Sequence, residues 1–585
     1  MDKKETKMIN LTIDGCKVSV AEGTTILDAA RSIGIKIPTL CYLKDINAIG
    51  ACRVCVVEVK GARSLIASCV TPVSEGMEVK TQTQTVLDSR KATVELLLSD
   101  HDKKCLSCVR NLNCELQTIS NELNCDTSKN LGEANEYALD LSSPSIARDN
   151  NKCILCRRCV AVCKTQQSVS VIGANARGFD THIGCAFEKD IAESPCVNCG
   201  QCINVCPTGA LREVDEIDEV IAAINNPEKH VVIAPAPSVR VALGEEFGYP
   251  IGTNVEGKMI TAMRMLGFDD VFDINFTADL TIIEEGYEFI NRVKNGGVLP
   301  MITSCSPGWI KFIEHYYPEN LANLSSCKSP QQMFGAIIKT YYAEKQGLDP
   351  KNIVMVTAMP CIAKKFEKGR ADQSAAGEGI PDIDHVLTTR ELARFIKRAG
   401  LMFRDLPEGK YDAPLGMFSG AGLIFGATGG VMEAALRTVV EVLENKPLEK
   451  LEFDAVRGTK GIKEAVYKVA GMDVKVAVTS GLANARKIME KVAKGEADYH
   501  FIEVMACPGG CVNGGGQPIV PADIRNNVDV QALRASAVYS TDKEMKLRKS
   551  HENPAVKELY DTYLGEPNGH KAHEILHTKY VKRGV

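Results

Sequence analysis

Alternating apolar and polar positions open the chain and predict a small β-rich module at its start. Residues 8–20 alternate around Asp14-Gly15, a dipeptide typical of a tight hairpin turn. Residues 24–34 place apolar positions at helical spacing between a capping threonine and a terminal glycine, which predicts a short helix. A second helix is expected over residues 86–99. Its apolar face is expected to contain Leu87, Val94, Leu97 and Leu98.

In the second half of the chain, apolar strands alternate with amphipathic helices. Nearly continuous apolar runs begin the segment 231–240 and fill 353–359 and 474–480, as in central parallel strands that are buried on both faces. Helical patterns over residues 330–345 and 389–400 lie between them. Strands that alternate with helices predict an α/β region.

The length and composition of the chain indicate a large protein of ordinary polarity. Its 585 residues suffice for several domains, and 45% hydrophobic with 24% charged residues is usual for a globular protein. A net charge of -5 without a basic cluster argues against a nucleic-acid partner. Residues 1–7 show no signal region and no run approaches the roughly 18 apolar residues of a membrane span, so we expect a cytoplasmic protein without a membrane partner.

The cysteines point to iron. Disulfides are rare in the cytoplasm, and many of the 23 cysteines are clustered at short spacings, which indicates metal ligands. The first group has the long-short-long spacing of plant-type 2Fe–2S ferredoxins, and with the hairpin and helix it resembles a β-grasp ferredoxin domain, expected over residues 1–85. Its ligands would be Cys41, Cys52, Cys55 and Cys69. Cys16 lies outside the pattern and is expected to pack in the core.

The second group mixes histidine with cysteine. His101, Cys105, Cys108 and Cys114 resemble the His-ligated 4Fe–4S module in the large peripheral subunit of NADH dehydrogenases. A zinc site with three Cys and one His is the chemical alternative. This module is expected over residues 86–145, with a polar linker from residue 126.

The third group is a duplicated run that resembles bacterial two-cluster ferredoxins and is expected over residues 146–216. In that fold the fourth cysteine of each run binds the other cluster. One 4Fe–4S cluster is therefore expected on Cys153, Cys156, Cys159 and Cys206, and another on Cys196, Cys199, Cys202 and Cys163.

Three later segments place cysteine beside proline or glycine. They are Thr303–Trp309, Met359–Glu367 and Phe501–Gln517, the last with glycines that let the backbone approach a bulky group. Together they closely resemble the signature motifs of the iron-only (FeFe) hydrogenases, and the resemblance covers essentially the whole chain. It implies an α/β catalytic domain over residues 217–585 that binds the H-cluster, a 4Fe–4S cubane joined to a two-iron subcluster with CO, cyanide and a bridging dithiolate.

One motif departs from the family. The resemblance gives Cys361, Cys507 and Cys511 as cubane ligands, but the usual pair of adjacent cysteines is here Cys305-Ser306. By strict alignment Ser306 takes the ligand position and Cys305 the proton-relay position. A serine alkoxide is a hard donor and matches iron-sulfide poorly. We therefore expect Cys305 to bind the cubane and Ser306 or a water to serve proton transfer; the opposite assignment stays open, as does impaired or tuned activity.

The resemblance also implies a pocket and a proton path. Lys364 corresponds to the lysine that pairs with a cyanide ligand. Further pocket positions are Ala236, Pro237, Ser238, Gln331, Met359, Phe425 and Met505. The relay positions are Glu285, Glu288, Arg292 and Ser325, ending near Cys305. Two glutamates three apart share one face of a helix, so a chain of acids is geometrically reasonable.

The implied activity is reversible interconversion of H2 with protons and electrons. Three accessory 4Fe–4S clusters and one 2Fe–2S cluster would conduct the electrons. We expect a flavin- and NAD(P)-binding partner subunit, a small 2Fe–2S subunit and ferredoxin, in an assembly that bifurcates electrons. The alternatives are a monomeric ferredoxin-linked hydrogenase, a hydrogen-sensing relative with low turnover, and a non-catalytic iron-sulfur electron-transfer subunit.

Overall fold

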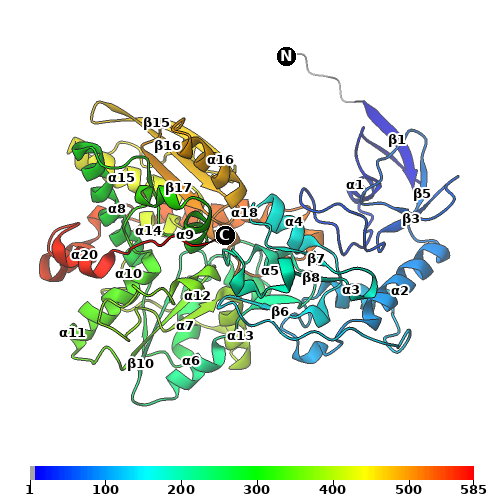
Figure 1. The fold of residues 1–585 in the computed structure, drawn as a ribbon, viewed down its shortest axis with the longest axis horizontal. Coiled ribbons are helices and arrows are strands. Elements are labelled where there is room, and N and C mark those ends of the chain that lie inside the picture. The colour runs from blue at the N-terminus through cyan, green and yellow to red at the C-terminus, as the bar shows by residue number, and fades with distance from the viewer. Residues whose placement is uncertain (1–6, 585) are drawn as a thin grey trace.

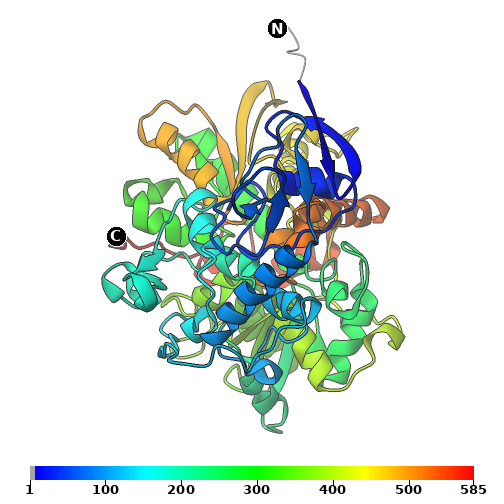
Figure 2. The ribbon, with the colours of Figure 1, turned by 90° about the vertical axis from the view of Figure 1, so that its right-hand side faces the viewer.

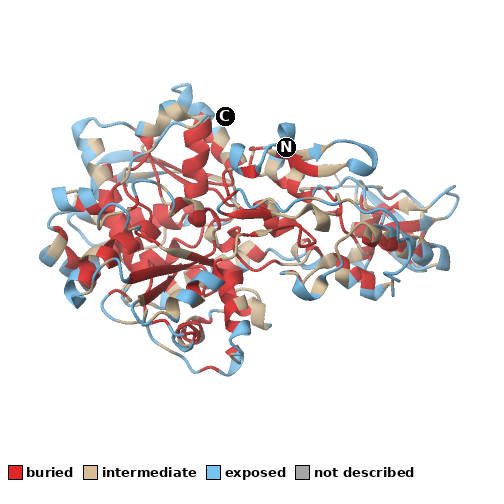
Figure 3. Cartoon of the chain, turned by 60° about the horizontal axis from the view of Figure 1, so that its bottom comes forward, coloured by how far each residue is buried: buried red, intermediate tan, exposed pale blue. Residues whose placement is uncertain are grey.

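Small N-terminal modules extend from one side of a larger lobe in the computed structural model (Figure 1), which describes residues 7–584. Residues 1–6, part of the segment that lacks a signal pattern, lie outside the described residues. Among residues 7–584, no helix has both the length and the apolar character required to cross a bilayer. Figure 3 shows the buried residues concentrated in the interior of the larger lobe.

The first module contains the predicted hairpin and helix. Strands β1 (Met8–Ile13) and β2 (Cys16–Ala21) pair antiparallel across Asp14 and Gly15, both with positive φ. Helix α1 (Ile26–Ser32) begins after Thr25, whose side chain accepts a hydrogen bond from the Asp28 N–H. The sheet order is β2-β1-β5-β3-β4, with β3 (Val56–Val59), β4 (Ile66–Ala67) and β5 (Glu78–Lys80). Cys16 is exposed, so the expectation that it packs in the core is wrong.

The second predicted helix forms, but part of its apolar face is assigned wrongly. Helix α2 (Gln84–Ser99) buries Val86, Arg90, Val94 and Leu98, every fourth position, whereas Leu87 is 38% exposed. Arg90 lies on the buried face and donates a hydrogen bond to the Val56 carbonyl at 2.8 Å. The module continues with a 3-10 turn (Cys105–Ser107) and α3 (Glu115–Glu122).

After a linker, the chain forms the region of the duplicated cysteine run. Residues 126–139 contain neither helix nor strand. Strands β6 (Ile146–Arg148) and β9 (Leu211–Glu213) then pair antiparallel and bring the two ends of this region together. Between them lie α4 (Arg158–Thr165), β7 (Ile172–Asn175), β8 (His182–Cys185) and α5 (Gln201–Val205).

Two four-stranded sheets form the larger lobe. The first has the order β11-β10-β13-β14 and is parallel throughout: β10 (His230–Pro235), β11 (Asp270–Val271), β13 (Ile353–Met359) and β14 (His385–Thr388). The second has the order β12-β17-β16-β15: β12 (Met301–Ile302), β15 (Ile462–Val469), β16 (Met472–Ser480) and β17 (Phe501–Met505). All three predicted central strands are central, but β16 has an antiparallel neighbour in β15.

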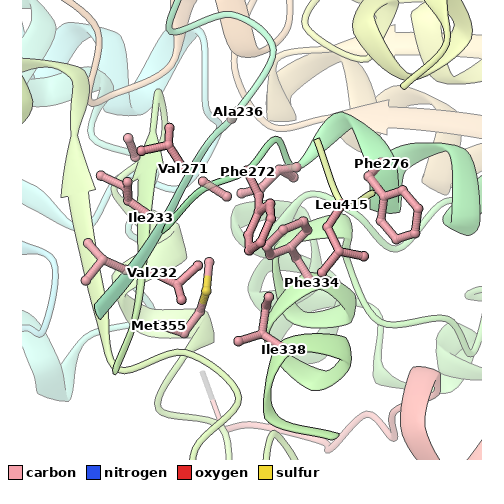
Figure 4. Close-up of a cluster of buried hydrophobic side chains, with 14 of the residues drawn as sticks. Val232, Ile233, Ala236, Val271, Phe272, Phe276, Phe334, Ile338, Met355 and Leu415 are labelled. Carbon is pink, nitrogen blue, oxygen red and sulfur yellow. The ribbon is translucent and has the colours of Figure 1, made fainter. Parts of the chain in front are cut away.

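Helices cover these sheets. They are α6 (Ile217–Ile224), α7 (Glu256–Met265), α8 (Asn275–Asn295), α9 (Pro307–Tyr316), α10 (Pro330–Ile337), α11 (Ala343–Gln346), α12 (Ala363–Glu367), α13 (Thr389–Arg398), α14 (Gly420–Ile424), α15 (Gly430–Glu444), α16 (Leu482–Ala493), α17 (Ala522–Arg525), α18 (Val530–Glu544), α19 (Pro554–Leu559) and α20 (His570–Leu576). The predicted helix over 330–345 consists of α10, a π-helical turn and α11. Figure 4 shows Val232 and Met355 of the first sheet on the side of Phe334 and Ile338, whereas Ile233, the next residue of β10, points to the opposite face.

The ends of the strands position the predicted motifs. In the first sheet, β10 leads into Ala236 and β13 leads into Cys361. In the second sheet, the parallel strands β12 and β17 lead into the segments that carry Cys305 and Cys507. Carboxyl ends of parallel strands are the usual place for a site in an open α/β sheet. Both sheets therefore direct their signature segments towards one region.

Candidate active site and electron route

One cavity receives the residues of all three signature segments. Its wall contains Cys361, Cys507 and Cys511, together with both Cys305 and Ser306. The structure thus brings together the three predicted cubane ligands and both candidates for the fourth. Thiolates are the ligands that iron-sulfur clusters require, so the donor set fits a cubane.

Glycines allow the chain to fold tightly around this cavity. A Cβ atom on Gly514 would lie 2.1 Å from the Pro360 carbonyl oxygen, and one on Gly515 would lie 2.3 Å from the Cys199 carbonyl oxygen. The same contact brings Cys199, a predicted ligand of an accessory cluster, to the wall of the catalytic cavity. The catalytic cavity and the two-cluster region are therefore in direct contact.

Most predicted pocket residues line the cavity, and they make it largely apolar. The lining includes Ala236, Pro237, Gln331, Met359, Phe425 and Met505. Ser238 does not line it: this buried side chain contacts Gln517, whose Nε2 donates to the Ser238 Oγ at 3.3 Å. Ile274 also lines the cavity and was missed, because a single apolar residue carries no distinguishing signal in the sequence.

Lys364 supplies the positive charge of the cavity wall. Its Nζ donates to Glu367 at 2.8 Å, to the Ser329 Oγ at 2.8 Å and to the Cys305 carbonyl at 3.2 Å. These contacts fix the ammonium group beside the motif that carries Cys305. The role of Glu367 was not predicted, although its position three residues after Lys364 on a helix was a usable signal.

Three of the predicted relay residues, Glu285, Glu288 and Arg292, lie on α8, and Ser325 joins them from the loop that precedes α10. Arg292 donates to Glu288 Oε1 at 2.6 Å, and the Ser325 hydroxyl donates to Glu288 Oε2 at 2.9 Å. Further inside, Glu285 Oε1 accepts from the Ser304 N–H at 3.4 Å and lies 3.3 Å from the Ser304 Oγ. Ser304 directly precedes Cys305, so the polar groups extend from Arg292 near the surface to the cavity.

Glu285 has the properties of a proton-transfer group. It is fully buried, and burial together with the negative charge of Glu288 raises its pKa to about 7. Its Oε2 has no hydrogen-bond partner among residues 7–584. A carboxyl group whose pKa lies near neutrality can accept and release protons at physiological pH.

The accessory cysteines also gather as predicted. In the first module the neighbouring thiols of Cys52 and Cys69 lower the pKa of Cys41, and the thiol of Cys69 lowers the pKa of Cys55. One small cavity is lined by Cys153, Cys156, Cys159 and Cys206, which is the predicted exchange of the fourth ligand. The second predicted cluster of this region is expected on Cys196, Cys199, Cys202 and Cys163. Burial and the nearby charges of Cys196 and Cys163 raise the pKa of the Cys202 thiol, so these three thiols lie close together.

The His/Cys module carries an orphaned imidazole nitrogen. Burial lowers the pKa of His101, which keeps the ring neutral as a metal ligand must be. Its Nδ1 is buried and has no hydrogen-bond partner within residues 7–584. With Cys105, Cys108 and Cys114 nearby in the sequence, this side chain fits the predicted cluster.

Two contacts place the outer modules beside the same group of cysteines. The Asn47 side-chain amide donates to the carbonyls of Cys41 at 2.8 Å and Cys156 at 3.1 Å. Arg110, in the His/Cys module, donates to the Cys206 carbonyl at 2.7 Å. The 2Fe–2S module and the His/Cys module therefore both adjoin the site of Cys153, Cys156, Cys159 and Cys206.

Comparison with known proteins decides the family. Residues 229–515 match the family described as iron only hydrogenase large subunit, C-terminal domain, and residues 528–583 match iron hydrogenase small subunit. The chain is 49% identical to the NADP-reducing hydrogenase subunit HndD of Solidesulfovibrio fructosivorans, an alignment that covers 98% of this chain and 99% of the relative. The chain belongs to the iron-only hydrogenase family. It is also 46% identical to iron hydrogenase 1 of Clostridium pasteurianum, over 98% of this chain and 100% of that protein.

Further similarities divide along the modules. The N-terminal regions match a 2Fe–2S iron-sulfur cluster binding domain (6–84), the NADH-ubiquinone oxidoreductase-G iron-sulfur binding region (90–129) and the NADH-quinone oxidoreductase subunit 3 ferredoxin-like domain (143–212). A solved structure of apo FeFe-hydrogenase HydA1 from Chlamydomonas reinhardtii, 43% identical with a TM-score of 0.57, covers 64% of this chain and 100% of that chain. This FeFe hydrogenase thus combines an H-cluster catalytic domain with 2Fe–2S and 4Fe–4S domains, and the non-catalytic alternative does not hold.

Proposed function

We propose that this FeFe hydrogenase exchanges electrons between H2 and pyridine nucleotide through partner subunits. The supporting observation is that a relative matching it over nearly its whole length at 49% identity is named an NADP-reducing hydrogenase subunit. The N-terminal modules match NADH dehydrogenase families as well. The partners we infer are a flavin- and NAD(P)-binding subunit, a small 2Fe–2S subunit and ferredoxin, and their assembly would bifurcate electrons.

The proposed electron route has a fork. Cys196, Cys199, Cys202 and Cys163 would hold the 4Fe–4S cluster next to the catalytic cavity, and Cys153, Cys156, Cys159 and Cys206 the following one. From there one branch leads through Asn47 to the 2Fe–2S cluster on Cys41, Cys52, Cys55 and Cys69. The other leads through Arg110 to the third 4Fe–4S cluster, on His101, Cys105, Cys108 and Cys114. Two outer branches suit an enzyme that serves more than one electron partner.

The protein itself would move the protons. When bound, the H-cluster supplies the metal centre at which H2 is formed or split and the first step of electron transfer. Glu288, held in place by Arg292, would take up protons near the surface, Ser325 would pass them inward, and Glu285 would deliver them beside Ser304 and Cys305. The apolar lining excludes bulk water, so protons and electrons use separate routes.

We propose Cys305 as the fourth cubane ligand, because its thiolate is the softer donor of the pair. The Ser306 Oγ already accepts a hydrogen bond from the Ala506 N–H at 3.2 Å, which occupies one of the oxygen lone pairs that would bind iron. Against this, burial and the charge of Glu285 raise the pKa of the Cys305 thiol, and proximity to Glu285 is what a relay thiol would show. The two possible assignments, Cys305 or Ser306 as the cubane ligand, make opposite predictions for variants of these two residues.

Variants at this pair test the ligand assignment. If Cys305 binds the cubane, Cys305→Ser loses the catalytic cubane, whereas Ser306→Cys assembles it normally. Cluster content is read from iron analysis, and the complete H-cluster from the infrared CO and cyanide bands after maturation. A Cys305→Ser protein that still assembles the complete cluster overturns the assignment. Turnover of Ser306→Cys relative to the parent separates a full catalyst from the hydrogen-sensing alternative, since a sensor should gain turnover with the second cysteine.

Purification from the native host tests the electron partners. We expect a flavin-containing subunit and a small 2Fe–2S subunit to co-purify, and the assembly to reduce NAD(P) with H2. A single chain without flavin that exchanges electrons with ferredoxin alone would instead support the monomeric alternative.

A further inference from the structure

A polar cleft lies where three modules of the chain meet. Its volume is about 480 Å³, which is the size of a small-molecule site, and it shares no lining residue with the catalytic cavity. Lys44 from the 2Fe–2S module, Asn204 from α5 and the segment from Arg525 to Arg534 form its walls. Figure 2 shows the blue N-terminal domain next to the orange segment that carries α18.

Arg525 brings a positive charge into this cleft without a carboxylate partner. Its neighbours Arg158 and Arg534 each pair with a glutamate, Glu115 at 2.9 Å and Glu245 at 2.6 Å. Arg525 has no ion pair within residues 7–584 and donates only to the Asn204 carbonyl, at 3.2 Å. Burial and the two neighbouring arginines lower its pKa to about 10. The Arg525 side chain is partly exposed to the cleft, so an anion bound there would contact it and offset the repulsion from the two neighbouring arginines.

A second group in the cleft also lacks its partner. Asn526 is 5% exposed, and its Oδ1 accepts a hydrogen bond from the Lys44 N–H at 2.9 Å. Its Nδ2 is buried and has no acceptor in the described part of the chain. Buried amide donors are nearly always paired, so this N–H group points to an absent acceptor. The lining has two carboxylates: Asp529 caps α18 by accepting from the Ala532 N–H at 3.0 Å, and Asp45 is exposed to solvent.

We propose that this cleft binds an oxyanion of the phosphate type, either free or carried by a nucleotide. The Arg525 guanidinium would bind two oxygens of the anion, and Asn526 Nδ2 would donate to another. The Lys44 ammonium, on the rim of the cleft, would add charge from the 2Fe–2S module. Because the walls come from three modules, a bound anion would hold the 2Fe–2S module against the catalytic lobe.

Calorimetric titration of the holoenzyme tests the site. Inorganic phosphate, pyrophosphate and NADP are titrated separately at constant ionic strength against chloride. We expect one site per chain, with affinity at least tenfold weaker in Arg525→Gln. The control Arg177→Gln removes an exposed arginine and should bind as the parent does. Tighter binding of NADP than of pyrophosphate identifies a nucleotide ligand, and equal binding identifies the phosphate group alone.

A second variant keeps the test decisive if Arg525→Gln folds poorly. Asn526→Asp places a carboxylate beside Arg525 while it keeps the acceptor for the Lys44 N–H. It should raise the melting temperature and abolish phosphate binding, because the internal charge replaces the anion. The proposal is overturned if no anion binds more tightly than chloride, or if Asn526→Asp binds phosphate as strongly as the parent. Hydrogenase activity does not enter either result, so the proposed electron partners are tested independently.

Discussion

At the scale of single residues, the site depends on charges that are held away from water. Glu285 is surrounded by protein and close to Glu288, so its ionised form is disfavoured. The ammonium group of Lys364 is held by hydrogen bonds to Glu367, Ser329 and the Cys305 carbonyl. Replacing Glu285 and replacing Lys364 should therefore have different effects on stability and activity.

Glu285→Gln should lower activity and change the pH dependence of stability. General acid-base groups contribute roughly 10²–10⁴-fold to rates, so we expect hydrogen evolution to fall by that order. The pKa of Glu285 rises from 4.5 unfolded to about 7 folded, so its contribution to stability is lost as pH rises through this window. The melting temperature of the variant relative to the parent should therefore be higher at pH 8 than at pH 5.

The control for this variant is Glu284→Gln on the same helix. Glu284 is buried too, but it pairs with Tyr560 and His577 and not with the relay. It should retain activity within a few-fold of the parent. Equal losses of activity in both variants would mean that Glu285 acts only through the fold.

Lys364→Met should lose both stability and activity, and a double variant should separate the two. Leaving Glu367 buried without its partner costs about 3–5 kcal/mol. Lys364→Met with Glu367→Gln should recover most of the melting temperature but not the hydrogen evolution, because the cation of the cavity wall is still absent. A double variant as active as the parent would contradict a functional role for this charge.

At the scale of elements, the contact between α5 and the loop after β17 joins electron transfer to catalysis. Gly200 directly precedes α5 as its N-cap, and Gly515 lies against it without room for a side chain. Strand β17 fixes the start of that loop, and the glycines let it pass close to Cys199. Backbone proximity of this kind depends on the absence of a Cβ atom.

Gly515→Ala should therefore separate the two elements. Its Cβ would lie 2.3 Å from the Cys199 carbonyl oxygen, and overpacking of this kind typically costs about 1–3 kcal/mol. We expect a lower melting temperature and slower dye-linked hydrogen evolution. The matched control is Gly173→Ala, whose Cβ would meet no atom within 4 Å. A Gly515→Ala protein that behaves like this control would show that the contact tolerates expansion.

At the scale of the whole molecule, the enzyme is a catalytic lobe extended by electron-transfer modules. The Chlamydomonas hydrogenase covers 64% of this chain with its own full length, so the catalytic fold exists in a protein without these modules. The first module has its own hydrophobic core, which includes Ile13, Leu27 and Val57. Loss of its cluster should therefore affect the electron route more than the chemistry.

Cys52→Ala tests this division of labour. Without a full ligand set the 2Fe–2S signal should disappear from the electron paramagnetic resonance spectrum. Dye-linked hydrogen evolution should stay within about twofold of the parent, while NAD(P)-linked activity should fall by about tenfold or more. Cys16→Ala, which removes an exposed thiol outside the cluster pattern, is the control. Equal loss of both activities would show that this module is required for the catalytic lobe itself.

The sequence alone determined the local features of this protein. The hairpin at Asp14-Gly15, the capped helix after Thr25 and the central strands follow from turn residues, capping and apolar runs, which act between neighbours in the chain. The grouping of cysteines and the family motifs likewise identified the cavity residues that the structure brings together. Short-range spacing suffices for these predictions because each depends on a few adjacent residues.

Only the tertiary structure decided which distant groups meet. The inward turn of Arg90, the displacement of Ser238 from the cavity and the unpaired charge of Arg525 depend on partners elsewhere in the chain. The partners are Val56, Gln517 and Asn204, which lie from 34 to 321 residues away in sequence. Hydrogen bonds and ion pairs act through space, and the burial that sets their strength arises only when the modules pack.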